Sequence, residues 1–254
     1  MPLNRRSFVT LSSASLAEPI AGAVLRPFVS GKSIEAVAFD AFAIFDPRPI
    51  FRACEAAFPG RGSALADAWR GRQFEYQWLR ALTGMYADFW RVTADALEFA
   101  AHSMQLDLSI QARDELMHGY LTLRAWPEVP AALEKLLRSG RKLAVLSNAT
   151  DAILNAGLAN SALTSAFQHI ISTDRIRTFK PDPRAYRLGT QVLGLREPQV
   201  MFVAFAGWDA AGAGWFGYPT FWNNRQNATV EELSVRPEGA GATLNELVEF
   251  LDDH

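Results

Sequence analysis

The chain has little cysteine, no excess of basic residues and no long apolar run, and each shortage excludes a class of protein. Its 254 residues include one cysteine, Cys54, which excludes an internal disulfide framework and a cluster of cysteine metal ligands. Lys and Arg total 25 against 27 Asp and Glu, and this net charge of −2 gives no sign of nucleic-acid binding. No apolar run reaches the length of about 18 residues that a membrane-spanning helix needs. The composition, 49% hydrophobic, and the length favour one globular domain with an insertion.

The first 32 residues differ from the rest of the chain. The pair Arg5-Arg6 precedes a mildly apolar stretch rich in Ser and Ala, and Ala21-Gly22-Ala23 is a candidate cleavage site. This pattern resembles a twin-arginine export signal. Glu18 and Pro19 interrupt the apolar stretch, so an N-terminal extension without an export role is the alternative. We expect a periplasmic protein with no membrane segment in its mature form if the signal is used, and a cytoplasmic protein otherwise.

The order of predicted elements after residue 33 favours an α/β fold. An apolar strand at 34–40 is followed only by helical patterns up to residue 122, and strands and helices then alternate. Strands that alternate with helices form parallel sheets with right-handed crossovers. We therefore predict a Rossmann-like parallel sheet core, made of residues 33–48 and 126–254, with an inserted helical cap domain at 49–125. The predicted cap helices are 50–58, 63–82, 86–106 and 110–122, and the predicted core strands after the cap are 142–146, 168–172, 200–205 and 219–222.

Polar residues follow four positions at which core strands end. They are Asp40, Ser147-Asn148, Lys180 and Asp209. The carboxyl ends of parallel strands meet at one edge of a sheet, so these residues are expected to converge there. Two carboxylates, a hydroxyl, an amide and an ammonium group are the parts of a covalent-catalysis site. Taken singly, Ser147-Asn148 also fits a helix N-cap, and Lys180 fits an ordinary loop.

The sequence resembles the haloacid dehalogenase superfamily, and within it the L-2-haloacid dehalogenase (type II) branch. The resemblance covers residues 34–251. It rests on the motifs Ala38-Phe39-Asp40-Ala41-Phe42, Trp69-Arg70 with Gln73 and Glu75-Tyr76-Gln77-Trp78-Leu79-Arg80, Leu146-Ser147-Asn148, Phe179-Lys180-Pro181-Asp182-Pro183 with Tyr186, and Phe202-Val203 with Gly207-Trp208-Asp209-Ala210-Ala211-Gly212.

The resemblance implies a hydrolase that converts short 2-haloalkanoic acids to 2-hydroxyalkanoic acids through an aspartyl ester. Asp40 would be the nucleophile, and Arg70 on the cap would accept the departing halide, which suits a guanidinium with a permanent charge and several donors. Lys180 would sit beside Asp40 and keep it ionised. Asp209 would pair with Lys180 or help to position water. The alternatives without a catalytic role are a surface salt bridge for Arg70 and a purely structural ion pair for Lys180 and Asp209.

The resemblance also implies the residues that bind the substrate. Ser147 and nearby backbone N–H groups would hold the substrate carboxylate, Asn148 would assist the halide site, and Tyr186 is an active-site residue in the family. Three aromatic residues, Phe42, Phe89 and Trp208, are expected to form an apolar wall that strips water from the nucleophile. Each of them alone also fits plain core packing.

The residue types around Asp40 argue against a metal. Phosphatases of the superfamily use Mg²⁺ and an acid two residues after the nucleophile, whereas this chain has Phe42 there. Mg²⁺ prefers several oxygen ligands of high charge, and the last motif supplies only Asp209. We therefore predict no metal and no cofactor. The predicted partner is a small-molecule 2-haloacid, and the family resemblance adds a homodimer as a further expectation.

The chain departs from the family pattern at three polar positions near the nucleophile. The usual Gly-Thr after the aromatic residue is replaced by Ala43-Ile44 in a loop one residue shorter, and the usual Ser and Asn near Asp209 are replaced in Ala204-Phe205-Ala206. One hydrogen bond to a charged group is worth roughly 1.5–3 kcal/mol, so these losses slow turnover or change the substrate preference. The main alternative is thus a catalytically impaired protein that binds small carboxylates, and a phosphatase is the more remote one.

Overall fold

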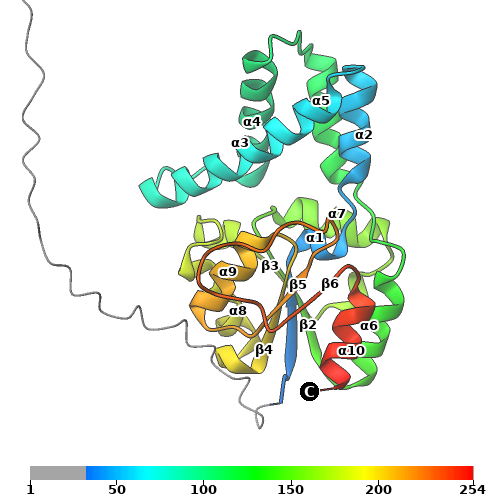
Figure 1. Ribbon diagram of the computed structural model, residues 1–254, viewed down its shortest axis with the longest axis vertical. Helices are drawn as coiled ribbons and strands as arrows, with labels where there is room; N and C mark the ends of the chain where they lie inside the picture. The colour runs from blue at the N-terminus through cyan, green and yellow to red at the C-terminus, as the bar shows by residue number, and fades with distance from the viewer. Residues whose placement is uncertain (1–32, 254) are drawn as a thin grey trace, which may run out of the picture.

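Six parallel strands form the centre of the protein (Figure 1). The computed structural model describes residues 33–253, so the predicted export signal and its cleavage site lie outside the described residues. Within that range, no helix is long and apolar enough to cross a membrane. The strand order is β3-β2-β1-β4-β5-β6. The strands are β1 (Ala36–Phe39), β2 (Lys142–Ser147), β3 (His169–Ser172), β4 (Val200–Ala204), β5 (Thr220–Asn223) and β6 (Gly239–Gly241).

Helices cover both faces of this sheet, as the alternation of strands and helices predicts. Strand β1 is fully buried, and its residues alternate between the faces: Val37 and Phe39 belong to one hydrophobic cluster, and Ala36 and Ala38 to the other. The first cluster includes residues of α6 (Val129–Arg138), α7 (Asp151–Asn160) and α10 (Leu244–Asp252), and the second includes residues of α8 (Pro183–Leu193) and α9 (Gly207–Phe216). A sheet buried on both faces explains why its strands read as continuous apolar runs.

Four helices between β1 and β2 stand together beyond the carboxyl ends of the strands (Figure 1). They are α2 (Arg48–Ala57), α3 (Gly62–Thr83), α4 (Phe89–Ser103) and α5 (Ile110–His118), and they occupy the stretch predicted as the cap. We call them the cap helices. The two chain crossings between core and cap helices run side by side: the Trp126 N–H donates to the Ile44 carbonyl at 2.9 Å, and the Asp46 N–H donates to the Arg124 carbonyl at 2.9 Å.

Element boundaries and two short elements differ from the sequence predictions. The helix predicted from residue 86 begins at Phe89, because the Asp88 side chain accepts a hydrogen bond from the Arg91 N–H and caps it. The helix predicted to run to residue 122 ends at His118 and continues as a 3₁₀ turn, Gly119–Leu121. Strand β6 was not predicted, since Gly-Ala-Gly carries no β-branched or aromatic side chain. The one-turn helix α1 (Ala41–Ile44) was also not predicted.

Candidate active site

Asp40 stands at the junction of β1 and α1. Its side chain is the N-cap of α1: Oδ2 accepts a hydrogen bond from the Phe42 N–H at 2.9 Å. Its own N–H donates to the Val203 carbonyl at 2.9 Å, which fixes it against β4. Only 9% of Asp40 is exposed. The carboxylate is thus held at the carboxyl edge of the sheet, where ligands of such sheets bind.

Lys180 joins the two carboxylates of the site. Its Nζ donates to Asp40 Oδ1 at 2.8 Å and to Asp209 Oδ2 at 2.6 Å, and it lies 4.9 Å from the centre of the Phe202 ring. The residue is 1% exposed. Burial alone would lower the pKa of Lys180, but attraction to Asp209 and Asp40 outweighs burial and raises the pKa above its ordinary value. Lys180 is therefore a permanent cation beside Asp40.

Asp209 lies in the first turn of α9, on the other side of Lys180. Burial raises the pKa of Asp209 to about 6; Lys180 opposes the shift and the charge of Asp40 adds to it. Asp209 Oδ1 accepts a hydrogen bond from the Tyr186 hydroxyl at 2.7 Å. Tyr186 is fully buried and lies behind Asp209, away from the pocket wall, so its direct contact is with Asp209.

Asn148 connects the end of β2 to both Lys180 and the cap helices. Its Oδ1 accepts from the Lys180 N–H at 2.7 Å, and its Nδ2 donates to Gln77 Oε1 on α3 at 2.7 Å. Ser147 Oγ accepts from the Ala149 N–H at 3.2 Å, which leaves the Ser147 hydroxyl hydrogen free to donate. The predicted Ser147-Asn148 pair thus lies at the same edge as Asp40 and Lys180, and it contacts the cap helices.

These residues, Tyr186 excepted, line a pocket between the core and the cap helices. The polar side of the wall is formed by the ionic and amide groups described above. The three aromatic residues expected to form an apolar wall do line this pocket, together with two that were not predicted. The aromatic lining residues are Phe42, Phe74, Phe89, Phe205 and Trp208.

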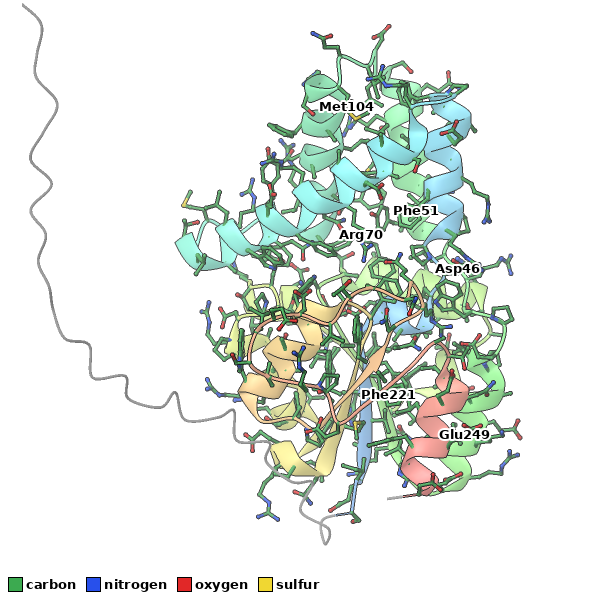
Figure 2. The ribbon with its side chains drawn as sticks, in the orientation of Figure 1. Asp46, Phe51, Arg70, Met104, Phe221 and Glu249 are labelled. Carbon is green, nitrogen blue, oxygen red and sulfur yellow. The ribbon has the colours of Figure 1, made fainter. Side chains whose placement is uncertain are left out.

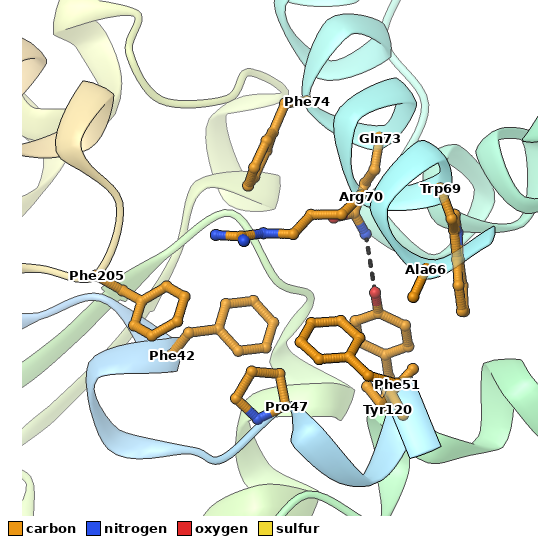
Figure 3. Close-up of a pocket in the computed structure, with 11 residues that line it drawn as sticks. Phe42, Pro47, Phe51, Ala66, Trp69, Arg70, Gln73, Phe74, Tyr120 and Phe205 are labelled. Atoms are coloured by element: carbon orange, nitrogen blue, oxygen red, sulfur yellow. Dashed lines mark hydrogen bonds between the residues drawn. The ribbon is translucent and has the colours of Figure 1, made fainter. Parts of the chain in front are cut away.

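Arg70 lies in an adjoining pocket and not on the wall around Asp40. It extends from α3 toward the core (Figure 2), and Figure 3 shows its guanidinium between Phe74 on one side and Phe42 and Phe205 on the other. Its Cζ lies 5.5 Å from the Phe74 ring and 5.6 Å from the Phe205 ring, and one terminal nitrogen donates to Gln226 Oε1 at 3.1 Å. Among residues 33–253, no carboxylate forms an ion pair with it.

Burial lowers the pKa of Arg70, and the nearby charge of Asp40 is one of the groups that oppose this shift. A guanidinium that is poorly hydrated and has no carboxylate partner favours an anion at its free donors. The two pockets share Phe42, Phe74 and Phe205.

Apolar packing and a backbone contact from a distant arginine surround the positions at which the family pattern has polar residues. Phe205 packs against Phe42 with ring centres 6.1 Å apart. The carbonyl of Ala43, in the shortened loop, accepts a hydrogen bond from Arg225 at 3.1 Å, and Arg225 is paired with Glu128 at 2.6 Å. Arg225, 182 positions along the chain from Ala43, thus holds the shortened loop from outside the pocket.

The position where a phosphatase would place its second acid is filled by the Phe42 ring, which packs on Phe205. Across the described part of the chain, no group of three or more His, Cys, Asp or Glu is placed to hold a metal ion. The donor set around Asp40 is one further carboxylate and one ammonium, which does not suit Mg²⁺. The absence of a metal stays a prediction, and it depends on Phe42.

Besides Arg70, helix α3 contributes pocket residues that the sequence analysis did not single out. Arg70, Phe74 and Gln77 are spaced i, i+4 and i+7, so they share one face of the helix. Gln77 is 1% exposed and faces the pocket. A glutamine on the same face as a predicted functional arginine was the available signal.

A carboxylate that contacts a lysine at the carboxyl edge of a parallel sheet, beneath a helical cap, defines a hydrolase that uses an aspartate nucleophile. The chain belongs to the haloacid dehalogenase-like hydrolases, in the branch of the L-2-haloacid dehalogenases: the family model matches residues 23–217. It is 39% identical over 220 residues to the (S)-2-haloacid dehalogenase of Pseudomonas sp. (strain YL), which covers 86% of this chain and 95% of that enzyme.

Solved structures agree with this assignment. The crystal structure of an L-2-haloacid dehalogenase has a TM-score of 0.85 and 38% identity, over 87% of this chain and all of that one. The L-2-haloacid dehalogenase from Xanthobacter autotrophicus, with chloropropionic acid covalently bound, has a TM-score of 0.76 and 32% identity, over 86% of this chain and 98% of that one. The predicted family and fold class are thereby confirmed.

Proposed function

We propose that this protein is an (S)-2-haloacid dehalogenase that hydrolyses short 2-haloalkanoic acids through an ester on Asp40, without a metal. The observation that carries the proposal is the contact of Lys180 Nζ with Asp40 Oδ1 at 2.8 Å, in a pocket with an aromatic wall. Relatives named as (S)-2-haloacid dehalogenases, and one of them with chloropropionic acid covalently bound, support the same chemistry.

In the first step, an Asp40 carboxylate oxygen attacks the α-carbon of the substrate, the carbon–halogen bond breaks, and the halide leaves with the bonding electrons. Lys180 balances the charge of Asp40 and Asp209 throughout. Arg70, in the adjoining pocket, receives the halide. The aromatic wall excludes water from around the nucleophile during the attack.

In the second step, water attacks the ester carbonyl carbon of Asp40, which releases the 2-hydroxy acid and restores the carboxylate. The family pattern would place a Thr, a Ser and an Asn near this water, and at the matching places in the sequence this chain has Ala43-Ile44 and Ala204-Phe205-Ala206. Asp209, which Lys180 and Tyr186 hold in place, is the carboxylate left to position the water. Slow ester hydrolysis is therefore the expected consequence of the apolar replacements.

A halide-release screen of the purified protein tests the proposed function. The substrates are haloacetates and both enantiomers of 2-chloro- and 2-bromopropionate, with a phosphate ester plus Mg²⁺ as a separate assay. We expect release from the haloacetates and from the (S) enantiomers. Binding of these acids without turnover would support the catalytically impaired protein, favoured by the three apolar replacements. Mg²⁺-dependent phosphate release would support the phosphatase.

The pH dependence of turnover is expected to report Asp209. Its carboxyl is protonated below its pKa of about 6, and the neutral form cannot orient water for attack on the ester. Turnover should thus rise with pH through about 6. The effect on folding stability has the opposite sign. Because the raised pKa means that folded Asp209 binds its proton more tightly than the unfolded chain does, the stabilisation is present below pH 3.8 and is lost as pH rises through about 6. Profiles of kcat from pH 5 to 8 measure the rise in turnover. In Asp209→Asn the rise of kcat near pH 6 should be absent.

Localisation and assembly are proposed from the sequence alone. We propose export through the Arg5-Arg6 signal, which N-terminal sequencing of the mature protein from its natural host checks: a start close after Ala23 supports export, and a start at or next to Met1 contradicts it. The homodimer implied by the family resemblance also stays a proposal.

A further inference from the structure

One amide group in the pocket wall has a donor with nothing to bind. Gln77 is 1% exposed, and its Nε2 has no hydrogen-bond partner among residues 33–253. Its other amide atom is committed, because Gln77 Oε1 accepts from Asn148 Nδ2 at 2.7 Å. A buried donor without a partner is costly to a protein, and such groups in native structures call for a ligand or a water.

The orientation of this amide follows from the groups around Asn148. Asn148 Oδ1 already accepts from the Lys180 N–H at 2.7 Å and from the Thr173 hydroxyl at 3.3 Å. Asn148 therefore donates from its NH₂ group to Gln77, and Gln77 must accept with its carbonyl oxygen. Turning the Gln77 amide over would place two NH₂ groups against each other, so the network leaves Nε2 as the free donor.

The free donor belongs to the pocket that holds the nucleophile. Gln77, Ser147, Asn148 and Asp40 all line this pocket. Ser147 keeps its hydroxyl hydrogen for a ligand, since its oxygen accepts from the Ala149 N–H. Two neutral donors, Gln77 Nε2 and the Ser147 hydroxyl, thus line this pocket, and Asn148 next to Ser147 in the chain is hydrogen-bonded to Gln77. Arg70, the cation without a carboxylate partner, lies beyond Phe42 and Phe74 in the adjoining pocket.

The two sets of donors fit the two ends of a 2-haloacid. Its carboxylate has two oxygens and needs more than one donor, and it must stay away from the negative charge of Asp40. Its halogen leaves as a single anion, which a guanidinium accepts. We infer that Gln77 Nε2 donates a hydrogen bond to the substrate carboxylate, beside Ser147, so that the cap helix α3 forms part of the carboxylate site. This inference rests on the proposed function.

Gln73 gives a matched control on the same helix. It lies one turn before Gln77, lines the same pocket and is 3% exposed, but its Nε2 already donates to Thr93 Oγ1 at 2.6 Å. The same substitution at the two positions therefore separates loss of a free donor from loss of a buried glutamine.

The test measures binding of propionate, a carboxylate without a halogen, by calorimetry of the full chain. We expect Gln77→Met to raise the Kd for propionate about tenfold or more, the usual effect of losing one hydrogen bond to a charged group. Gln77→Glu keeps the acceptor for Asn148 but replaces the donor with a carboxylate, so its effect should be larger. Gln73→Met should stay within about twofold of the wild type, and chloride inhibition should be unchanged in Gln77→Met.

The outcomes separate this inference from the proposed function. Unchanged propionate binding in both Gln77 variants would overturn the inference, as would equal losses in Gln77→Met and Gln73→Met, or a wild-type protein that binds no propionate. If the wild type releases no halide but Gln77→Met still weakens propionate selectively, the carboxylate site stands and the proposed turnover fails. Where halide is released, KM for 2-chloropropionate should rise in Gln77→Met with kcat little changed.

Discussion

Replacing Asp40 by asparagine is expected to lower halide release from a 2-haloacid by roughly 10⁴-fold or more, the scale of losing a catalytic nucleophile. An amide nitrogen or oxygen is a poor nucleophile toward the α-carbon, whereas the amide oxygen can still accept from the Phe42 N–H and cap α1. Loss of activity without loss of fold is the result expected. Halide release and thermal unfolding of the same sample measure the two.

Asp46→Asn is a suitable control for this variant. Asp46 lies six residues further on, at the crossing from core to cap helices, and pairs with Arg48 at 2.7 Å near the surface. Such a pair is worth about 0–1 kcal/mol, and Asp46 does not line the Asp40 pocket. Activity in Asp46→Asn should stay within about threefold of the wild type, on the same scale. Comparable losses in the two variants would mean that Asp40 acts through the fold and not as the nucleophile.

Replacing Lys180 by methionine is expected to destabilise the protein by about 3–5 kcal/mol, because it leaves two buried carboxylates without their shared cation. Activity should also fall to background, since nothing then balances the charge next to the nucleophile. The loss should be larger at pH 8 than at pH 5, where a shared proton relieves the repulsion between the two carboxylates. Urea unfolding at both pH values measures these differences.

Lys135→Met gives the matched comparison. Lys135 is exposed on α6 and does not line the Asp40 pocket. The same substitution there should therefore change stability by less than about 0.5 kcal/mol. A Lys180→Met variant as stable as Lys135→Met would show that the ion pairs with Asp40 and Asp209 contribute nothing net to stability.

The parts of this protein that the sequence predicted are those fixed by local patterns and by topology. Apolar runs mark β1 and β2, Pro130 and Gly140 bracket α6, and the parallel order of strands brings Asp40 and Lys180 to one edge. The contact between Asp40 and Lys180, 140 positions apart, was expected from the family resemblance, and the strand order accounts for the two residues lying at the same edge. Family motifs then added Arg70 on the cap.

Other parts depend on contacts that no local pattern encodes. The Arg225 hydrogen bond to the Ala43 carbonyl joins a loop after β5 to the nucleophile loop, and its residue types fit many other pairings. The role of Gln77 depends on which groups the Asn148 amide binds, and only the three-dimensional network shows these partners. The structure places Arg70 on α3 in a pocket that adjoins the Asp40 pocket and shares Phe42 and Phe74 with it, which the family motif alone does not show.

A single turnover in ¹⁸O-labelled water tests the central claim, the covalent ester on Asp40, most directly. With enzyme in excess over 2-chloropropionate, the account predicts an unlabelled hydroxyl in the product and one heavy oxygen in the peptide that contains Asp40. The label reaches Asp40 because water attacks its carbonyl carbon and the original carboxylate oxygen leaves with the product. Heavy oxygen found in the product after that first turnover, with Asp40 unlabelled, would contradict the account.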